Sequence, residues 1–156
     1  MTLSLPTVLQ VFASSGSALR ALTAWGRKLR GDRRALVLEL GDNLKYLDMV
    51  ADDRVALGEV VDKLSAAEYE RLARAGFNFN SLKRGRIRPF PSLEGTNMAS
   101  WPGKTTGELV ESIYDRLRDL KVRYPHLGHD DGHRWGVRVN NIRKRIWLLL
   151  RHVDLT

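Results

Sequence analysis

The sequence predicts an all-α fold, an antiparallel bundle of four to five helices with one long irregular loop at about residues 77–103. Apolar residues recur at spacings of three and four along most of the chain, which places them on one face of a helix. Two Ser/Thr-x-x-Glu sequences are typical of helix starts. With 156 residues, 43% of them hydrophobic, the chain is expected to form a single domain, residues 1–156.

The first two helices are predicted at residues 7–30 and at about 32–51. Pro6 suits the start of the first helix, Gly31 marks its end, and Asp32 is the expected N-cap of the second. The second helix has an apolar stripe and an acidic opposite face. The stripe contains Leu36, Leu40, Leu44, Leu47 and Ala51, and the acidic face contains Glu39, Asp42 and Asp48.

The middle of the chain predicts a third helix at residues 55–64 and a short fourth helix that ends at Gly76. A capping box formed by Ser65 and Glu68 is expected to open the fourth helix. Residues 77–103 contain three prolines and several glycines, which favours an irregular loop or flap, and this is the segment in which one short β-hairpin is expected.

Two further helices complete the predicted bundle. A second capping box, Thr105 with Glu108, opens a helix that Pro125 is expected to terminate. The last helix is predicted at residues 133–153. Its apolar stripe contains Trp135, Val139, Ile142, Ile146, Leu149 and Val153.

The net charge of +8 is concentrated in the second half of the sequence: residues 1–76 carry 11 Lys and Arg against 10 Asp and Glu, whereas residues 77–156 carry 15 against 8. A surface of one sign favours polyanions such as nucleic acid, anionic lipid or an acidic protein. The absence of cysteine excludes disulfides and thiol chemistry and suits a cytoplasmic location. No cofactor is expected.

Residues 3–26 raise the possibility of membrane contact, because Arg20 is the single charge in this stretch. Polar residues interrupt the stretch, and its apolar residues fall on one helical stripe. The sequence therefore favours an amphipathic helix packed in the bundle over a helix on a membrane surface.

The first candidate site is the segment that contains Lys83, Arg84, Arg86 and Arg88. Cations neutralise phosphates, and nearby aromatic rings stack on unpaired bases. The neighbouring rings are those of Phe77, Phe79, Phe90 and Trp101. The alternative is that these aromatic side chains fix the loop to the bundle while the cations point into solvent.

The second candidate site is a loop rich in histidine, with His126, His129, Asp131 and His133 as weak candidate metal ligands. The favoured alternative is a polar turn in which Asp130 or Asp131 caps the last helix.

The third candidate site is a polar stripe on the last helix, formed by Arg134, Arg138, Asn141, Arg145 and His152. Two Arg and His pairs, Arg145 with His152 and Arg123 with His129, resemble those of the HEPN ribonucleases, and this resemblance implies metal-independent RNA cleavage. The family usually has a polar residue directly after the arginine, where this chain has Ile146 and Tyr124. The alternative is that the arginines pair with acidic residues of neighbouring helices such as Glu39, Asp42 and Asp115.

The leading functional hypothesis is a basic, RNA-associated nucleic-acid-binding domain without enzymatic activity. Its binding residues would be Lys83, Arg84, Arg86, Arg88, Phe90, Arg138, Arg143, Lys144 and Arg145. One alternative is a regulatory subunit that binds an acidic protein partner or a second copy of the chain. The other is the HEPN-like ribonuclease.

Overall fold

The computed structural model describes residues 16–154. In chain order the elements are α2 (Ser17–Lys28), α3 (Gly31–Ala51), α4 (Leu57–Val60), η1 (Val61–Lys63), α5 (Ala67–Arg74), η2 (Phe79–Leu82), η3 (Pro91–Leu93), α6 (Thr106–Leu127), η4 (Asp131–His133) and α7 (Trp135–His152), where η denotes a 3-10 helix. There is no β-strand in this part of the chain, so the prediction of an all-α fold is confirmed.

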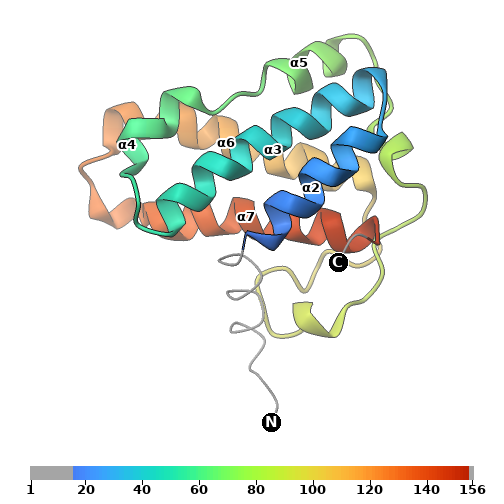
Figure 1. Cartoon of the computed structure of the whole chain (residues 1–156). Helices are drawn as coiled ribbons and strands as arrows, with labels where there is room; N and C mark the ends of the chain where they lie inside the picture. The colour runs from blue at the N-terminus through green and yellow to red at the C-terminus, as the bar shows by residue number, and fades with distance from the viewer. Residues whose placement is uncertain (1–15, 155–156) are drawn as a thin grey trace.

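The long helices form an antiparallel bundle around α7 (Figure 1). Helix α2 returns through a tight corner into α3, and α7 contacts α2, α3 and α6. Helices α3 and α6 run opposite to α7, which places the C-terminus of α2, the N-termini of α3 and α6 and the C-terminus of α7 at one end (Figure 1). None of the helices within residues 16–154 combines the length and the apolarity that crossing a bilayer requires.

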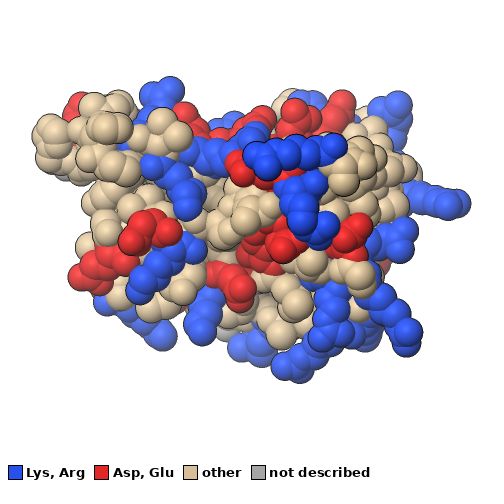
Figure 2. All heavy atoms as spheres, turned by 90° about the horizontal axis from the view of Figure 1, so that it is seen from above, with Lys and Arg blue, Asp and Glu red and all other residues tan. Residues whose placement is uncertain are grey.

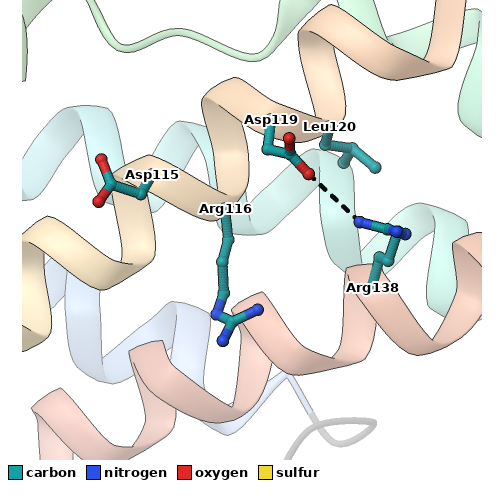
Figure 3. A pocket seen from close by; sticks show the side chains of 5 residues that line it. All are labelled: Asp115, Arg116, Asp119, Leu120 and Arg138. Carbon is teal, nitrogen blue, oxygen red and sulfur yellow. Dashed lines mark hydrogen bonds and ion pairs between the residues drawn. The ribbon is translucent and has the colours of Figure 1, made fainter.

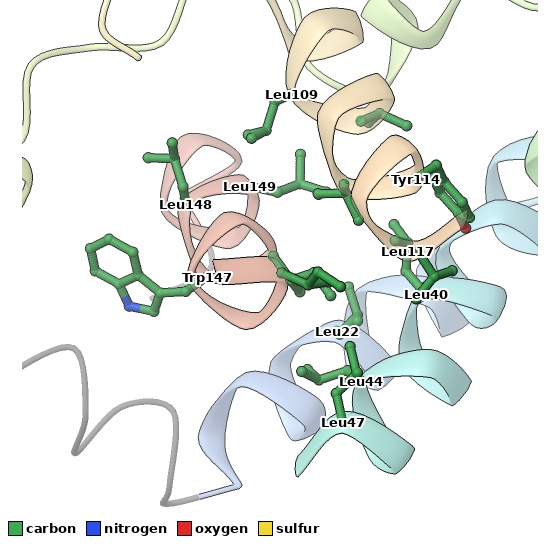
Figure 4. Packing of buried hydrophobic residues seen from close by; sticks show 14 of the residues in the cluster. Leu22, Leu40, Leu44, Leu47, Leu109, Tyr114, Leu117, Trp147, Leu148 and Leu149 are labelled. Carbon is green, nitrogen blue, oxygen red and sulfur yellow. The ribbon is translucent and has the colours of Figure 1, made fainter. Parts of the chain in front are cut away.

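The predicted apolar stripes meet in one core between these helices (Figure 4). Leu22 of α2, Leu44 of α3, Leu117 of α6 and Leu149 of α7 are each at most 1% exposed. Removing such side chains from water is the main stabilising contribution to a helical bundle. Residues 57–64, which include α4 and η1, add four buried side chains to this core: Leu57, Val60, Val61 and Leu64.

The boundaries at the α2–α3 corner differ from the prediction. Helix α2 begins at Ser17 because Gly16 adopts a left-handed φ of 73°, which interrupts the predicted helix 7–30; the positions before Gly16 lie outside the described residues. The break between α2 and α3 falls at Leu29 and Arg30, and Gly31, whose φ is 59°, is the first residue of α3 directly after it. The predicted N-cap Asp32 lies in the first turn of α3 and pairs with Arg71 of α5 at 3.1 Å.

The prediction that Glu39 lies on an exposed acidic face is wrong, and so is the capping box at Ser65. Glu39 is buried, and its carboxylate accepts hydrogen bonds from the backbone N–H groups of Glu68 (2.8 Å) and Tyr69 (3.2 Å) and from the Ser65 hydroxyl (3.0 Å). Ala66 is the N-cap residue of α5. A carboxylate from α3 therefore satisfies the free N–H groups of α5 and neutralises its positive end.

The second predicted capping box is confirmed. The Thr105 hydroxyl accepts from the Glu108 backbone N–H at 3.2 Å, and the Glu108 carboxylate accepts from the Thr105 N–H at 2.9 Å. The predicted end of this helix at Pro125 is wrong, because α6 continues to Leu127. Pro125 lies in the last turn, where the missing N–H removes only one hydrogen bond before the helix ends.

The segment between α5 and α6 is irregular, as predicted, and its apolar side chains are packed against the bundle. The buried side chains of this segment are Ile87, Phe90, Leu93, Met98 and Trp101. The expected hairpin is absent from it, and an isolated bridge joins Arg86 to Thr105. Packing of the aromatic residues into the core is the alternative interpretation stated above for this segment.

Candidate nucleic-acid interface

The cations of residues 83–88 are exposed to different degrees at the end of the bundle where α7 stops. Arg84 and Arg86 are exposed, and the Arg86 guanidinium donates to the Gly103 carbonyl at 2.7 Å. Lys83 and Arg88 both pair with Asp154, at 3.4 and 2.8 Å. The hydrogen bond from Lys83 and the charge of Arg88 lower the pKa of the Asp154 carboxyl group below its usual value. One carboxylate thus serves two cations, and the segment keeps an excess of positive charge.

A second basic segment, which the sequence analysis missed, lies at the corner between α2 and α3. Five exposed cations occur within eight residues: Arg27, Lys28, Arg30, Arg33 and Arg34. Among the described residues, no carboxylate lies within ion-pair distance of these five side chains; Asp32, between them, pairs with Arg71. The signal was present in the local density of Lys and Arg, but the acidic residues of α3 hid it when charge was counted over each half of the chain.

The structure brings these two segments to the same end of the bundle. The Arg33 guanidinium donates to the Ser81 hydroxyl at 3.3 Å, two residues before Lys83. In Figure 2 the Lys and Arg side chains gather along the edge that corresponds to the α2–α3 end of Figure 1, whereas the rest of the visible face mixes both signs. We call residues 27–34 and 83–88 together the basic end.

Of the four aromatic residues near residues 83–88, Phe90 and Trp101 are buried, whereas Phe77 and Phe79 are half-buried. Phe90 is 7% exposed, and the guanidinium groups of Arg88 and Arg151 lie 5.4 and 5.3 Å from its ring centroid. Trp101 is 6% exposed, and Lys104 lies 4.7 Å from its ring centroid. The expected role of Phe90 in stacking on unpaired bases is inconsistent with this burial.

Two of the four cations that were predicted on α7, Arg138 and Arg143, pair with carboxylates of neighbouring helices. Arg143 is buried and pairs with Asp48 of α3 at 2.8 Å. Arg138 pairs with Asp119 of α6 at 3.2 Å, as Figure 3 shows. Arg145 is buried, whereas Lys144 is half-buried. The acidic partners are Asp48 and Asp119, not the Glu39, Asp42 and Asp115 suggested by the sequence.

The first of the two Arg and His pairs does not form one catalytic site. His152 is buried, and its Nε2 lies 2.8 Å from the hydroxyl of Thr106, which donates to the carbonyl of Lys83 at 2.7 Å. Because that hydroxyl hydrogen is used, the imidazole Nε2–H donates to Thr106. Arg145 lies seven residues earlier, about 10 Å along the helix, and contacts Ser112 instead.

In the second pair, Arg123 with His129, both side chains are exposed, and the arginine is engaged by a carboxylate. Arg123 donates to Asp119 at 2.7 Å, one turn earlier in α6. His129 lies beyond the end of α6 in the turn that leads to η4. Neither pair therefore shows the convergence that acid–base cleavage of RNA requires.

The histidine-rich turn closes the bundle at its other end. His133 stacks on Trp135 with ring centroids 5.2 Å apart, and its Nε2 lies 3.4 Å from the Asp130 carboxylate. Asp130 accepts from the Gly132 N–H at 2.9 Å and does not cap α7, whose N-cap residue is Arg134. His126 and His129 are exposed. The described side chains contain no cluster of ligands that could hold a metal ion; the side chain of the remaining candidate, Asp131, lies outside this description.

Comparisons of the chain with protein-family models, with curated proteins and with solved structures found no match. Fold and charge define the chain as an all-α bundle with a strongly basic end.

Proposed function

We propose that this protein binds nucleic acid through its basic end, by contacts to the phosphate backbone. The observation that supports the proposal is the meeting of two basic segments that are about fifty residues apart in sequence. Together they carry nine Lys and Arg side chains. The acidic residues at this end are Asp32, which pairs with Arg71, and Asp154, which pairs with Lys83 and Arg88. Nucleic acids are the polyanions whose regularly spaced phosphates interact with many such cations at once.

The burial of the Phe90 and Trp101 rings favours recognition of nucleic acid through its phosphates and not through its bases. Proteins that prefer single strands stack bases on exposed rings, but the Phe90 and Trp101 rings are buried and covered by cations. Phosphate contacts position a protein on its ligand and carry no sequence information. The protein is therefore expected to bind duplexes at least as tightly as single strands, without sequence preference.

The test is the salt dependence of binding, measured by fluorescence anisotropy with a labelled 20-base-pair RNA duplex. The test variant removes three charges from the α2–α3 corner: Arg27→Gln, Lys28→Gln and Arg30→Gln. Each lost phosphate contact lowers the slope of log K against log salt by about 0.9, so the slope should fall by about 3. At 0.1 M salt the affinity should fall by about two orders of magnitude.

The matched control removes three exposed cations from other parts of the bundle: Lys45→Gln, Arg54→Gln and Lys63→Gln. This variant has the same net charge as the test variant, so it should keep most of the affinity and of the salt slope. Equal losses in the two variants would show that net charge alone attracts the duplex, and the basic end would not be the site. A chain that binds an acidic polypeptide such as poly-glutamate as tightly as the duplex, at equal charge concentration, would contradict the choice of nucleic acid.

A further inference from the structure

A groove outside the basic end lies between α6 and α7 and is closed on one side by residues 97–104. Its volume is about 560 Å³, within the range of small-molecule sites. Asn97, Ser100 and Trp101 line it from the connecting segment, Ser112 and Arg116 from α6, and Arg145 from α7. We call this the Arg145 groove.

Arg145 is a buried cation without a carboxylate partner among the described residues. The residue as a whole is only 4% exposed to solvent. Nε donates to the Ser112 hydroxyl at 3.1 Å and Nη1 to the Asn141 carbonyl at 2.9 Å, which are both neutral acceptors. Arg143, two residues earlier, is equally buried but has the Asp48 carboxylate as countercharge. Burying a cation without a countercharge is costly, so the site favours an anion from outside the chain.

The charge of Arg116 strengthens this preference. Arg116 extends from α6 towards α7, apart from the Asp119–Arg138 ion pair (Figure 3). Burial and the positive charge of Arg116 lower the pKa of Arg145 to about 10, so Arg145 stays protonated at neutral pH. Two cations that repel each other across one groove attract a doubly charged anion more strongly than a singly charged one.

Three acidic residues also line the groove, and one of them is offset from outside it. Asp115 pairs with Arg118 at 2.7 Å. Glu108 accepts the Thr105 N–H in the capping box and keeps its negative charge. Glu108 and Glu111 therefore remain against Lys104, Arg116 and Arg145, which leaves the groove with an excess of one positive charge. Glu111 supplies an acceptor for a hydroxyl or amino group of a larger ligand.

We infer that the Arg145 groove binds the phosphate monoester of a nucleotide-sized ligand, with Arg145 and Arg116 on the phosphate. A phosphate monoester carries close to two negative charges at neutral pH, and guanidinium groups match its oxygen geometry. The groove is larger than a phosphate ion and has room for a sugar and a base. Two sources offer this chemistry, a free mononucleotide and the 5′-phosphorylated end of a nucleic-acid strand.

The test compares AMP, adenosine and inorganic phosphate by isothermal titration calorimetry, using the full chain. AMP should bind, adenosine should not, and inorganic phosphate should compete with AMP. Arg116→Gln should weaken AMP binding about tenfold or more, the factor expected from losing one charge-assisted hydrogen bond. Because Arg116 is exposed, this variant should fold normally. Arg123→Gln is the matched control: it removes the same charge from an exposed position of the same helix, neither Arg123 nor its partner Asp119 lines the groove, and AMP binding should be unchanged.

A second comparison distinguishes the two sources. If the groove takes strand ends, a single-stranded RNA 10-mer with a 5′-phosphate should bind more tightly than the same strand with a 5′-hydroxyl, and Arg116→Gln should abolish the difference. If it takes free mononucleotides, AMP should bind while the two strands bind equally. No AMP binding at millimolar concentration together with equal binding of the two strands would overturn the inference, as would equal losses in Arg116→Gln and Arg123→Gln.

The inference is independent of the proposed function. The variant lacking Arg27, Lys28 and Arg30 should lose duplex binding and still bind AMP. Loss of AMP binding in that variant would place the phosphate site at the basic end and not in the groove.

Discussion

The arginines of the basic end and those of α7 differ in what surrounds the same chemical group. At the basic end, Arg27, Arg30 and Arg84 are exposed, and no described carboxylate lies within ion-pair distance of them. On α7, Arg143 is buried against Asp48, and Arg138 bridges to Asp119. The number of cations in a segment therefore does not by itself predict binding. What counts is whether the fold has already supplied each cation with an anion.

Arg145 combines a property of each group: it is as buried as Arg143, but like the exposed arginines it lacks a carboxylate partner among the described residues. Its neutral hydrogen-bond acceptors fix the orientation of the guanidinium without neutralising its charge. Two positions of one helix that are two residues apart thus provide a structural ion pair and a candidate ligand site.

The largest expected effect is the loss of the buried ion pair on α7. Arg143→Met should lower the free energy of unfolding by about 3–5 kcal/mol, because Asp48 is left as an uncompensated buried charge. Chemical denaturation followed by circular dichroism measures this. Adding Asp48→Asn should recover part of the loss. A small effect of Arg143→Met on the free energy of unfolding would show that Arg143 contributes no more to stability than the exposed cations do.

The next effect concerns the buried acid of α3. Glu39→Ala removes three hydrogen bonds at the start of α5 and should destabilise the protein by about 2–4 kcal/mol, since each bond to a charged group contributes about 1.5 kcal/mol or more and part of the loss is regained by water. Asp42→Ala, three residues further along α3 and exposed, is the control and should change stability by less than about 0.5 kcal/mol. Similar values for both would show that Glu39 does not act as the cap.

A smaller effect is a pH dependence that originates at His152. Burial of the imidazole and the nearby charges of Lys83 and Arg88 lower the pKa of His152 below its usual value of 6.5. The unfolded chain then takes up a proton at a higher pH than the folded chain, so stability falls as the pH drops below about 6.5 and levels off below the folded-state pKa. His152→Gln keeps an N–H donor for Thr106 and should lose this component of the pH profile. An unchanged profile between about pH 7 and 5 would assign it to other groups.

The smallest effect on stability is expected at the basic end. Arg84→Gln together with Arg30→Gln should change the free energy of unfolding by less than about 0.5 kcal/mol, because both side chains are exposed and unpaired within the described chain. The same variant should weaken duplex binding and lower the salt slope by about 2. A large loss of stability here would show that these cations have structural partners.

Much of the fold follows from local sequence. The stripes that contain Leu44 and Ile146 have the periodicity of a helix face, and both residues are fully buried. The Thr105 capping box is a four-residue signal and forms as predicted. The errors at Gly16 and Pro125 concern single backbone positions, where neighbouring turns decide whether a helix stops or continues.

The candidate site was predictable only in part. The cations of residues 83–88 were identified from their density in the sequence, and residues 27–34 carry the same signal at equal strength. Counting charge over each half of the chain concealed it, because Asp42, Asp48 and other acids of α3 offset it in the sum while lying elsewhere on the surface.

The sequence by itself determined the helices, the irregular segment and the positions of the basic clusters, because hydrophobic periodicity and charge density are local properties. Only the tertiary structure decided that Glu39 caps another helix, that Arg143 meets Asp48, that Arg145 has no carboxylate, and that residues 27–34 lie beside residues 83–88. Burial and long-range pairing set the free energy of each charge, and both depend on which helices pack together.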